Sequence, residues 1–304
     1  MYAIELGKSG LTVPTVAVGC MRISDMKEKE IRAFIDTAME KGANFFDHAD
    51  IYGGGKCEEV FGKAVPASLR EKIFIQTKCG IVPGKMFDFS YGHIVSSVEG
   101  SLRRLGTDYV DVLLLHRPDA LMEPEEVARA FSELKESGKV RHFGVSNQNP
   151  YQMELLQSAL DMPLCANQLQ FGVMHAPMIQ SGINVNMYND SGVNRDGSVL
   201  DFCRLNKITI QPWSPMQYGF FEGCFIDNEK FPALNKKLGE IADKYGASKT
   251  AIAFAWILRH PAKMMPVTGT TNLKRLSDCL DAADIRLTRE EWYEIYKAAG
   301  NILP

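Results

Sequence analysis

Short apolar, β-branched segments alternate with longer amphipathic segments along most of the chain. Apolar runs of about four to eight residues are typical of buried strands, and a hydrophobic period of about 3.6 residues is typical of surface helices. The pattern predicts strands at Thr15–Gly19, Asn44–Phe46, Ile73–Thr77, Val110–Leu115, Arg141–Val145, Leu164–Asn167, Ile208–Pro212 and Met264–Val267. It predicts helices at Glu28–Lys41, Glu58–Val65, Tyr91–Leu105, Glu125–Ser137, Pro150–Leu160, Val199–Leu205, Phe231–Tyr245, Lys249–Leu258, Leu273–Ala282 and Arg289–Ala299.

Strands that alternate with helices in this way favour an α/β fold, a (β/α)₈ TIM barrel, because parallel strands need crossover helices. A doubly wound open sheet is the alternative. Its first strand should be followed by a glycine-rich turn, but Cys20-Met21-Arg22 follows here. The run Gly53-Gly54-Gly55 does not complete a G-x-G-x-x-G motif, because Glu58 stands where the last glycine would be.

Two segments lie outside this alternation. Tyr2–Leu6 and Leu11–Pro14 predict an N-terminal β-hairpin that caps the bottom of the barrel. Gly172–Ser198, rich in Asn, Gly and Met, predicts a long loop of the kind that serves binding or is mobile. Since no linker or repeat interrupts the pattern, and a barrel commonly takes about 250 residues, we expect a single domain over residues 1–304.

Composition argues against several classes of protein. The formal net charge is −3 and the basic residues are scattered, so neither nucleic acid nor an anionic membrane is an expected partner. The chain shows no secretory leader and no apolar run long enough to cross a bilayer. Seven cysteines without a C-x-x-C pair argue against a disulfide framework or structural zinc, so a reducing cytoplasm is the expected compartment. The oligomeric state stays open.

The residues at the carboxyl ends of the predicted strands point to a functional site. In a barrel these ends face the active-site mouth. From strand two to strand eight, they carry hydrogen-bonding or aromatic residues: Asp47, Lys78, His116, Ser146-Asn147, Gln168, Trp213-Ser214 and Gly269-Thr270-Thr271. Because each of these successive strands ends in such a residue, we expect one site at the carboxyl face.

Four of these residues suggest proton-handling chemistry. Asp47 and Lys78 end adjacent strands, so we expect a buried ion pair, with Tyr52 leaning over it from the following loop. A free tyrosine has a pKa of about 10, and a neighbouring ammonium favours the phenolate and lowers that value. His116 would then orient a substrate oxygen. The set suits a carbonyl or an alcohol.

Each of these residues also has a structural interpretation when taken alone, as a loop cap, a solvated charge or a core-edge aromatic residue. His48 and Asp50 are assigned to such a structural role. The other histidines, His93, His142, His175 and His260, show no metal-ligand spacing, so no metal site is expected.

The segment Gly269-Thr270-Thr271-Asn272 precedes a helix, and barrels often bind phosphate after their last two strands. Arg275 lies one turn into that helix, and Trp213 can stack on a flat ring. An ordinary helix N-cap is the alternative interpretation of this segment. Its coincidence with the eighth strand favours a cofactor site.

Together these residues resemble the aldo-keto reductases. Asp47, Tyr52, Lys78 and His116 match the order and spacing of that family's catalytic tetrad. The segments LGKSGLTVPTVAVGCMR, FFDHADIYGGGKCEEVFGKAV, SLRRLGTDYVDVLLLHRPD, GKVRHFGVSN and PWSPM extend the resemblance over nearly the whole chain. Among branches, the chain most resembles bacterial oxidoreductases with the LLLHRPD form.

The resemblance implies reduction of an aldehyde or ketone with NADPH (NADP⁺) rather than NADH, with Tyr52 as general acid. Implied contacts at the nicotinamide end are Ser146, Asn147, Gln168 and Trp213. Those along the pyrophosphate path are Ser214, Pro215, Met216, Gly219 and Phe221. Those at the adenosine phosphate end are Gly269, Thr270, Thr271 and Arg275. Cys20 and Met21 are implied near the ribose, and Asp47 also counts among the cofactor contacts.

Two other functions remain open at this stage. One is a redox sensor or partner-binding barrel that holds NADPH with little turnover. The other is a Schiff-base aldolase that uses Lys78, although a paired Asp47 would keep that lysine charged and poorly nucleophilic.

Overall fold

Seven parallel strands form one curved sheet in the computed structural model, which describes residues 3–304. The strands lie in the order β3, β4, β5, β8, β9, β10, β11. Their bounds are Val18–Gly19, Phe45–Asp47, Phe74–Cys79, Val110–Leu115, Val140–Ser146, Leu164–Gln170 and Thr209–Trp213. Because spatial order follows chain order, each crossover leads to the next strand, which is the arrangement of a TIM barrel.

Residues 264–268 close the barrel between its two edge strands. On one side, Met265 N–H donates to the carbonyl of Ile210 at 2.9 Å and Val267 N–H to that of Pro212 at 2.8 Å. On the other side, Ala17 N–H donates to the carbonyl of Pro266 at 2.9 Å. This segment is the predicted eighth strand, but it pairs as a single parallel bridge between Ala17 and Val267 rather than as a regular strand.

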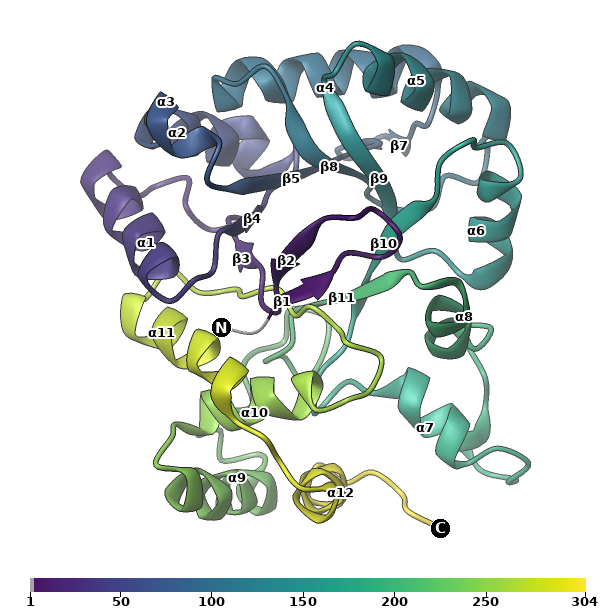
Figure 1. Ribbon diagram of the computed structural model, residues 1–304. Helices are drawn as coiled ribbons and strands as arrows, with labels where there is room; N and C mark the ends of the chain where they lie inside the picture. The colour runs from purple at the N-terminus through teal and green to yellow at the C-terminus, as the bar shows by residue number, and fades with distance from the viewer. Residues whose placement is uncertain (1–2) are drawn as a thin grey trace.

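Helices surround the sheet (Figure 1). The principal ones are α1 (Glu28–Glu40), α2 (Lys56–Ala64), α4 (Tyr91–Leu105), α5 (Pro124–Glu136), α6 (Pro150–Gln157), α8 (Val199–Asn206), α9 (Pro232–Tyr245), α10 (Lys249–Leu258), α11 (Leu273–Asp281) and α12 (Arg289–Ala298). In α5 the buried side chains are Val127, Ala130, Phe131 and Leu134, a spacing that places them on one face against the sheet. Among the described residues, every helix is too short or too polar to cross a lipid bilayer.

Local sequence explains where several helices begin and end. Ser90 caps the start of α4 by accepting a hydrogen bond from His93 N–H, and Gly106 ends that helix in the left-handed conformation. Asn149 and Thr288 form capping boxes at the starts of α6 and α12. Each cap satisfies backbone groups that a helix end would otherwise leave without partners.

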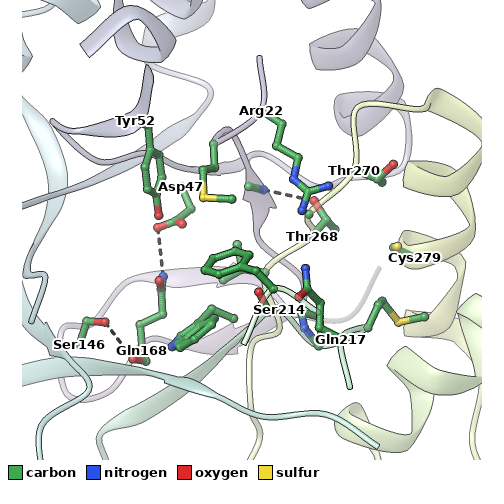
Figure 2. A pocket seen from close by; sticks show the side chains of 18 of the residues that line it. Arg22, Asp47, Tyr52, Ser146, Gln168, Ser214, Gln217, Thr268, Thr270 and Cys279 are labelled. Carbon is green, nitrogen blue, oxygen red and sulfur yellow. Dashed lines mark hydrogen bonds between the residues drawn. The ribbon is translucent and has the colours of Figure 1, made fainter. Parts of the chain in front are cut away.

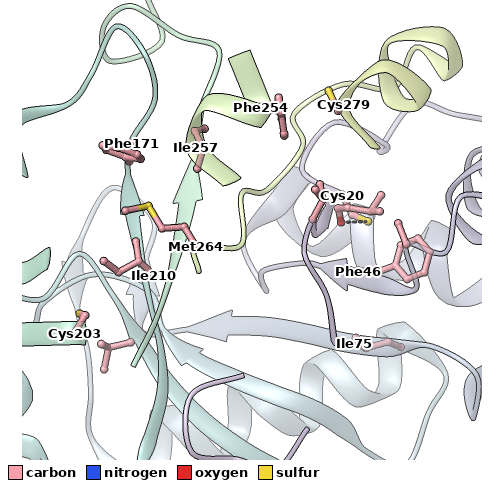
Figure 3. Close-up of a cluster of buried hydrophobic side chains, with 14 of the residues drawn as sticks. Cys20, Phe46, Ile75, Phe171, Cys203, Ile210, Phe254, Ile257, Met264 and Cys279 are labelled. Carbon is pink, nitrogen blue, oxygen red and sulfur yellow. Dashed lines mark hydrogen bonds between the residues drawn. The ribbon is translucent and has the colours of Figure 1, made fainter. Parts of the chain in front are cut away.

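Two hydrophobic cores hold these layers together. The larger core lies between the sheet and the helices, where side chains such as Phe46, Ile75, Ile210 and Phe254 are buried (Figure 3). The smaller core fills the barrel interior and contains Val112, Leu114, Phe45 and Met265, together with Leu6 and Val13 from the N-terminal hairpin.

The hairpin closes the lower end of the barrel, as the sequence predicts. Strands β1 (Ala3–Glu5) and β2 (Thr12–Pro14) pair antiparallel and lie across the barrel axis (Figure 1). Gly7 N–H donates to the Thr209 hydroxyl at 2.8 Å. Tyr2, at the start of the predicted hairpin, lies outside the described residues.

Several elements differ from the sequence-based expectation. The first predicted strand is regular only at Val18–Gly19. The predicted loop 172–198 contains helix α7 (Pro177–Ile183), which has proline at its first position, and the 3₁₀ turn η2 (Asp190–Gly192). A small hairpin, β6 (Ile81–Val82) with β7 (Met86–Phe87), and the short helix α3 (Ala67–Arg70) follow no strong periodic signal.

Candidate active site

A cavity of about 490 Å³ opens at the carboxyl ends of the barrel strands. The predicted site residues that line it are Met21, Asp47, Tyr52, His116, Ser146, Asn147, Gln168, Trp213, Ser214, Pro215, Met216, Phe221, Gly269, Thr270, Thr271 and Arg275. Figure 2 shows Tyr52, Asp47, Ser146 and Gln168 at one end of this cavity and Thr270 and Cys279 at the other.

Lys78 joins the polar groups at the deep end of the cavity. Its ammonium group is fully buried and donates to both carboxylate oxygens of Asp47, at 2.8 and 2.9 Å. It also donates to the backbone carbonyl of His48 at 2.7 Å and to the Tyr52 hydroxyl at 3.1 Å. The structure therefore contains the expected ion pair, with the phenol of Tyr52 held against it.

Burial and charge compete over the protonation of this cluster. Burial alone would lower the pKa of Lys78, but Asp47 and Tyr52 outweigh it, so that pKa is raised and the ammonium stays charged. For Tyr52, burial outweighs the opposing attraction of Lys78, so the pKa of the phenol is raised above its usual value. The expected lowering of the Tyr52 pKa is therefore wrong in its net direction, because desolvation disfavours the phenolate more than the Lys78 ammonium stabilises it.

His116 lies edge-on to Tyr52, with ring centroids 5.9 Å apart. Burial, Lys78 and Arg117 together hold the pKa of the imidazole well below its usual value, so the ring is neutral at physiological pH. Its Nδ1 atom is buried and has no hydrogen-bond partner within the described part of the chain. A neutral imidazole can donate one hydrogen bond to a ligand in the cavity.

A tight turn places Tyr52. After β4 ends at Asp47, the chain enters a 3₁₀ turn over Tyr52–Gly55, where Tyr52 N–H donates to the carbonyl of Ala49 at 3.1 Å. Gly53, Gly54 and Gly55 have φ values of 57°, 63° and 90°, a region that glycine enters without steric cost. The triple glycine therefore lets the chain reverse directly beside the ion pair.

A group of buried amides holds Asp47 from the other side. Gln168 Nε2 donates to Asp47 Oδ1 at 3.1 Å and to Gln211 Oε1 at 3.2 Å. Gln76 also donates to Asp47 Oδ1 and exchanges hydrogen bonds with Gln211. The carboxylate is thus oriented by amides as well as by the ammonium. Gln76 and Gln211 point into the barrel interior and were not among the predicted site residues.

The residues expected at a nicotinamide carboxamide form one connected group. Trp213 Nε1 donates to Asn147 Oδ1 at 3.1 Å, Asn147 Nδ2 donates to Ser146 Oγ at 2.7 Å, and Ser146 Oγ donates to the Gln168 carbonyl at 3.0 Å. Asn147 and Ser214 have φ values of 58° and 48°. Non-glycine residues with such values are uncommon and often occur at functional sites.

The far end of the cavity combines hydroxyls, backbone and cations. Thr270, Thr271 and Arg275 line it, and a Cβ atom at Gly269 would meet no atom within 4 Å. The Asn272 side chain accepts a hydrogen bond from Arg275 N–H at 3.0 Å, so the helix-cap interpretation of this segment also holds.

Two predicted cofactor contacts lie outside the cavity lining. Cys20 is fully buried, and its thiol donates to the carbonyl of Val18 at 3.6 Å, because the side chain turns into the core at the end of β3. The carbonyl of Gly219 accepts a hydrogen bond from Gln170 Nε2 at 3.2 Å. The structure does not bring these two residues together with the others.

The cavity lining also includes residues that were not among the predicted catalytic or cofactor contacts, notably Arg22, Arg117, Gln217 and Thr268. Arg22 directly follows Met21, and Arg117 directly follows His116. Reading one residue beyond Met21 and His116 would have identified both arginines. Gln217 and Thr268 carry no comparable signal, because their position depends on the course of the loops.

The lining fits an elongated dinucleotide. Its deep end offers amides and an indole. Two buried polar atoms of lining residues, His116 Nδ1 and Gln217 Oε1, have no hydrogen-bond partner in residues 3–304. Its far end offers hydroxyls, the open space at Gly269 and the guanidinium of Arg275. Amides suit a carboxamide, and cations beside hydroxyls suit phosphate.

Comparison with known proteins agrees with this geometry. The family model described as "Aldo/keto reductase family" matches residues 15–299. The chain is 36% identical to the uncharacterized oxidoreductase YcsN of Bacillus subtilis, with 98% of each chain covered. It is 37% identical to the 6-dehydroglucose reductase of Agrobacterium fabrum, with 95% of each covered. A crystal structure of the thermostable aldo-keto reductase Tm1743 in complex with the inhibitor epalrestat superposes with a TM-score of 0.79 at 28% identity, covering 98% of this chain and 100% of the other.

Proposed function

Because this chain belongs to the aldo/keto reductase family and is an oxidoreductase, we propose that it uses NADPH to reduce an aldehyde or ketone to the alcohol. The observation that carries this proposal is the contact of Lys78 with both Asp47 and the Tyr52 hydroxyl, at the end of a cavity large enough for a ligand.

Tyr52 donates the proton in this proposal. Its phenol is protonated at neutral pH, which is the state that a proton donor needs, and Lys78 opposes the rise in pKa that burial causes. As the proton leaves, the developing phenolate is 3.1 Å from the Lys78 ammonium, which stabilises the negative charge. Asp47 keeps that ammonium charged and in place. His116 donates a hydrogen bond from its neutral imidazole and orients the carbonyl oxygen.

The nicotinamide, when bound, supplies the hydride that reduces the carbonyl carbon. Ser146, Asn147 and Gln168 would hold its carboxamide, and Trp213 would stack on its ring. Arg275 and Arg22 would bind the phosphates, and a phosphate contact by Arg275 underlies the preference for NADPH over NADH.

Several further features accompany this proposal. All seven cysteines are free, which suits the reducing cytoplasm that the sequence predicts. We also propose that residues 1–304 form one domain, and that the chain belongs to the bacterial branch with the LLLHRPD form. The organisms of the two relatives named above support the latter.

The alternative functions have weaker support. Lys78 is charged and bonded to Asp47, His48 and Tyr52, which opposes nucleophilic attack on a carbonyl and therefore the aldolase. The similarity to proteins named as reductases favours turnover over a sensor with little activity.

The Tyr52→Phe variant tests the function. It should lower kcat for aldehyde reduction by about 10² to 10⁴-fold, because only the proton donor is lost. Trp213 fluorescence, titrated separately with NADPH and NADH, should show wild-type affinity and a preference for NADPH. Trp256 and Trp292 are buried and stacked on each other, so they serve as a constant background.

Full activity of the Tyr52→Phe variant would contradict the assigned proton donor. Equal quenching by both nucleotides would contradict the NADPH preference alone, and no quenching by either would remove the hydride source from the proposal.

A further inference from the structure

Arg117 lies at the reacting end of the cavity. It directly follows His116 at the carboxyl end of β8, lines the cavity and is partly buried. Its guanidinium carbon lies 5.5 Å from the centroid of the Trp213 ring. The charge of Arg117 is therefore held between the residues proposed to orient the carbonyl and to stack on the nicotinamide.

This guanidinium has no carboxylate partner among residues 3–304, since none of the ion pairs or side-chain hydrogen bonds there involves it. The acid nearest in sequence, Asp119, is engaged elsewhere. One of its oxygens accepts from Phe89 N–H at 2.8 Å and the other from Leu121 N–H at 2.9 Å. Both hydrogen bonds hold the loop after β8, so Asp119 does not neutralise Arg117.

The charges of the cavity lining leave this cation without a counter-ion. The charged lining residues are Arg22, Asp47, Arg117 and Arg275. Asp47 is already neutralised by Lys78 at 2.8 Å. Arg22 lies beside Thr268 (Figure 2) and Arg275 lies in α11, at the end proposed for the cofactor phosphates. Only Arg117 among these cations adjoins the position of the reacting carbonyl.

An unpaired, partly desolvated guanidinium attracts an anion strongly. Burial lowers the pKa of Arg117, which reflects the loss of water around its charge, and Tyr52 acts in the opposite direction. A guanidinium presents parallel N–H donors that match the two oxygens of a carboxylate, and such charge-assisted pairs are stronger than neutral hydrogen bonds.

We propose that Arg117 binds a carboxylate on the carbonyl substrate, so that this enzyme prefers aldehydes or ketones that carry a carboxylate over neutral ones of the same shape. This inference rests on the proposed reductase function and adds the substrate class. Arg117 acts as a specificity-determining residue, while Tyr52 still protonates the carbonyl oxygen.

A matched pair of substrates tests the inference. Succinic semialdehyde carries a carboxylate, and methyl 4-oxobutanoate is its neutral ester with the same carbon chain to the aldehyde. In the wild type, kcat/KM for the acid should exceed that for the ester by about tenfold or more, mainly through KM. Arg117→Met, which keeps the length of the side chain but not its charge, should reduce this acid-to-ester ratio by at least about tenfold. Arg117→Lys should recover part of it.

The ratio cancels effects of the substitution on folding and on cofactor binding, because both substrates meet the same enzyme. An acid-to-ester ratio equal in the wild type and in Arg117→Met would overturn the inference. An equal loss of kcat/KM for glyceraldehyde and for succinic semialdehyde in Arg117→Met would also overturn it, because glyceraldehyde carries hydroxyls but no charge. Failure of the wild type to reduce any of the three aldehydes with NADPH or NADH would instead contradict the proposed reductase function.

Discussion

His48 and Asp50, the two ionisable residues between Asp47 and Tyr52, show how burial changes residue chemistry. Burial, and then Lys78, lowers the pKa of His48 to about 3, so the ring is neutral. Burial, and then Glu58, raises the pKa of Asp50 to about 7. The structural role expected from the sequence fits His48, whose ring packs 4.5 Å from that of Phe61. At Asp50, in contrast, burial and Glu58 disfavour the charged form of the carboxyl.

Replacing Asp50 by Asn should change the pH dependence of stability. The unfolded carboxyl releases its proton near a pKa of about 4, whereas the folded one keeps it to about 7, so wild-type stability falls as pH rises between these values. The neutral amide has no such loss. The difference in the free energy of unfolding, Asp50→Asn minus wild type, should therefore grow by roughly 3 kcal/mol from pH 4 to pH 7.

Urea unfolding at several pH values measures this difference, with the exposed Asp36→Asn as a matched control. A difference that stays constant or shrinks as pH rises would show that Asp50 is not held protonated in the folded state. The opposing titration of His48 is present in both proteins and cancels from the comparison.

At the scale of elements, the turn that carries Tyr52 packs against a partly buried ion pair. Arg104 of α4 donates to Glu58 of α2 at 2.8 Å, and Glu58 also accepts from the Thr77 hydroxyl at 2.6 Å. Gly55 lies directly over this arginine, since a Cβ atom there would be 2.8 Å from Arg104 Cδ. The position of the proton donor therefore depends on how α2, α4 and the strand β5 pack.

Gly55→Ala should disturb that packing more than Gly54→Ala. Both glycines have positive φ, but a Cβ atom at Gly54 meets nothing of the described chain within 4 Å, whereas one at Gly55 would lie 2.8 Å from Arg104 Cδ. The Arg104 side chain, which donates to buried Glu58, would then have to shift. We expect Gly55→Ala to lose at least about 1 kcal/mol more unfolding free energy than Gly54→Ala. It should also lower kcat, since Tyr52 begins the same turn.

Denaturant unfolding and steady-state kinetics on both variants give the answer. Similar losses in the two would indicate that backbone conformation alone, rather than the contact with Arg104, limits this turn.

For the whole molecule, barrel closure depends on the close approach of the first strand and residues 264–268. Gly19 N–H donates to the Thr268 hydroxyl at 3.2 Å, and a Cβ atom at Gly19 would lie 2.1 Å from the carbonyl oxygen of Thr268. Gly19 is not in a positive-φ conformation, so the requirement for glycine here comes from this contact and not from the backbone.

Gly19→Ala should therefore destabilise the protein by about 1–3 kcal/mol, because the closing segment must move away from β3. Gly239→Ala in α9 is the matched control. Its nearest neighbour would be Lys249 Cε at 3.5 Å, an ordinary contact, and alanine in a helix interior should stabilise by about 0.5–1 kcal/mol. Unfolding free energies that are equal for Gly19→Ala and wild type would show that closure tolerates a wider gap.

The sequence by itself determined the order of strands and helices and the chemical character of the strand ends. Asp47, His116 and Trp213 follow from the rule that carboxyl ends of barrel strands meet at one face, and the structure places all three around one cavity. Hydrophobic periodicity is local, so it is readable without knowledge of distant contacts. Boundaries were less predictable, as at the short strand β3, because the neighbouring strand decides where pairing stops.

Only the tertiary structure decided quantities that depend on several distant segments at once. The net direction of the Tyr52 pKa shift is a balance between burial, to which the whole fold contributes, and the charge of Lys78. The burial of Cys20, whose thiol lies against the carbonyl of Val18 in the core, likewise depends on segments distant in the chain. That Arg117 meets no carboxylate of residues 3–304 also required knowing which groups Asp119 contacts. Charge and burial act through space, and the fold alone sets those distances.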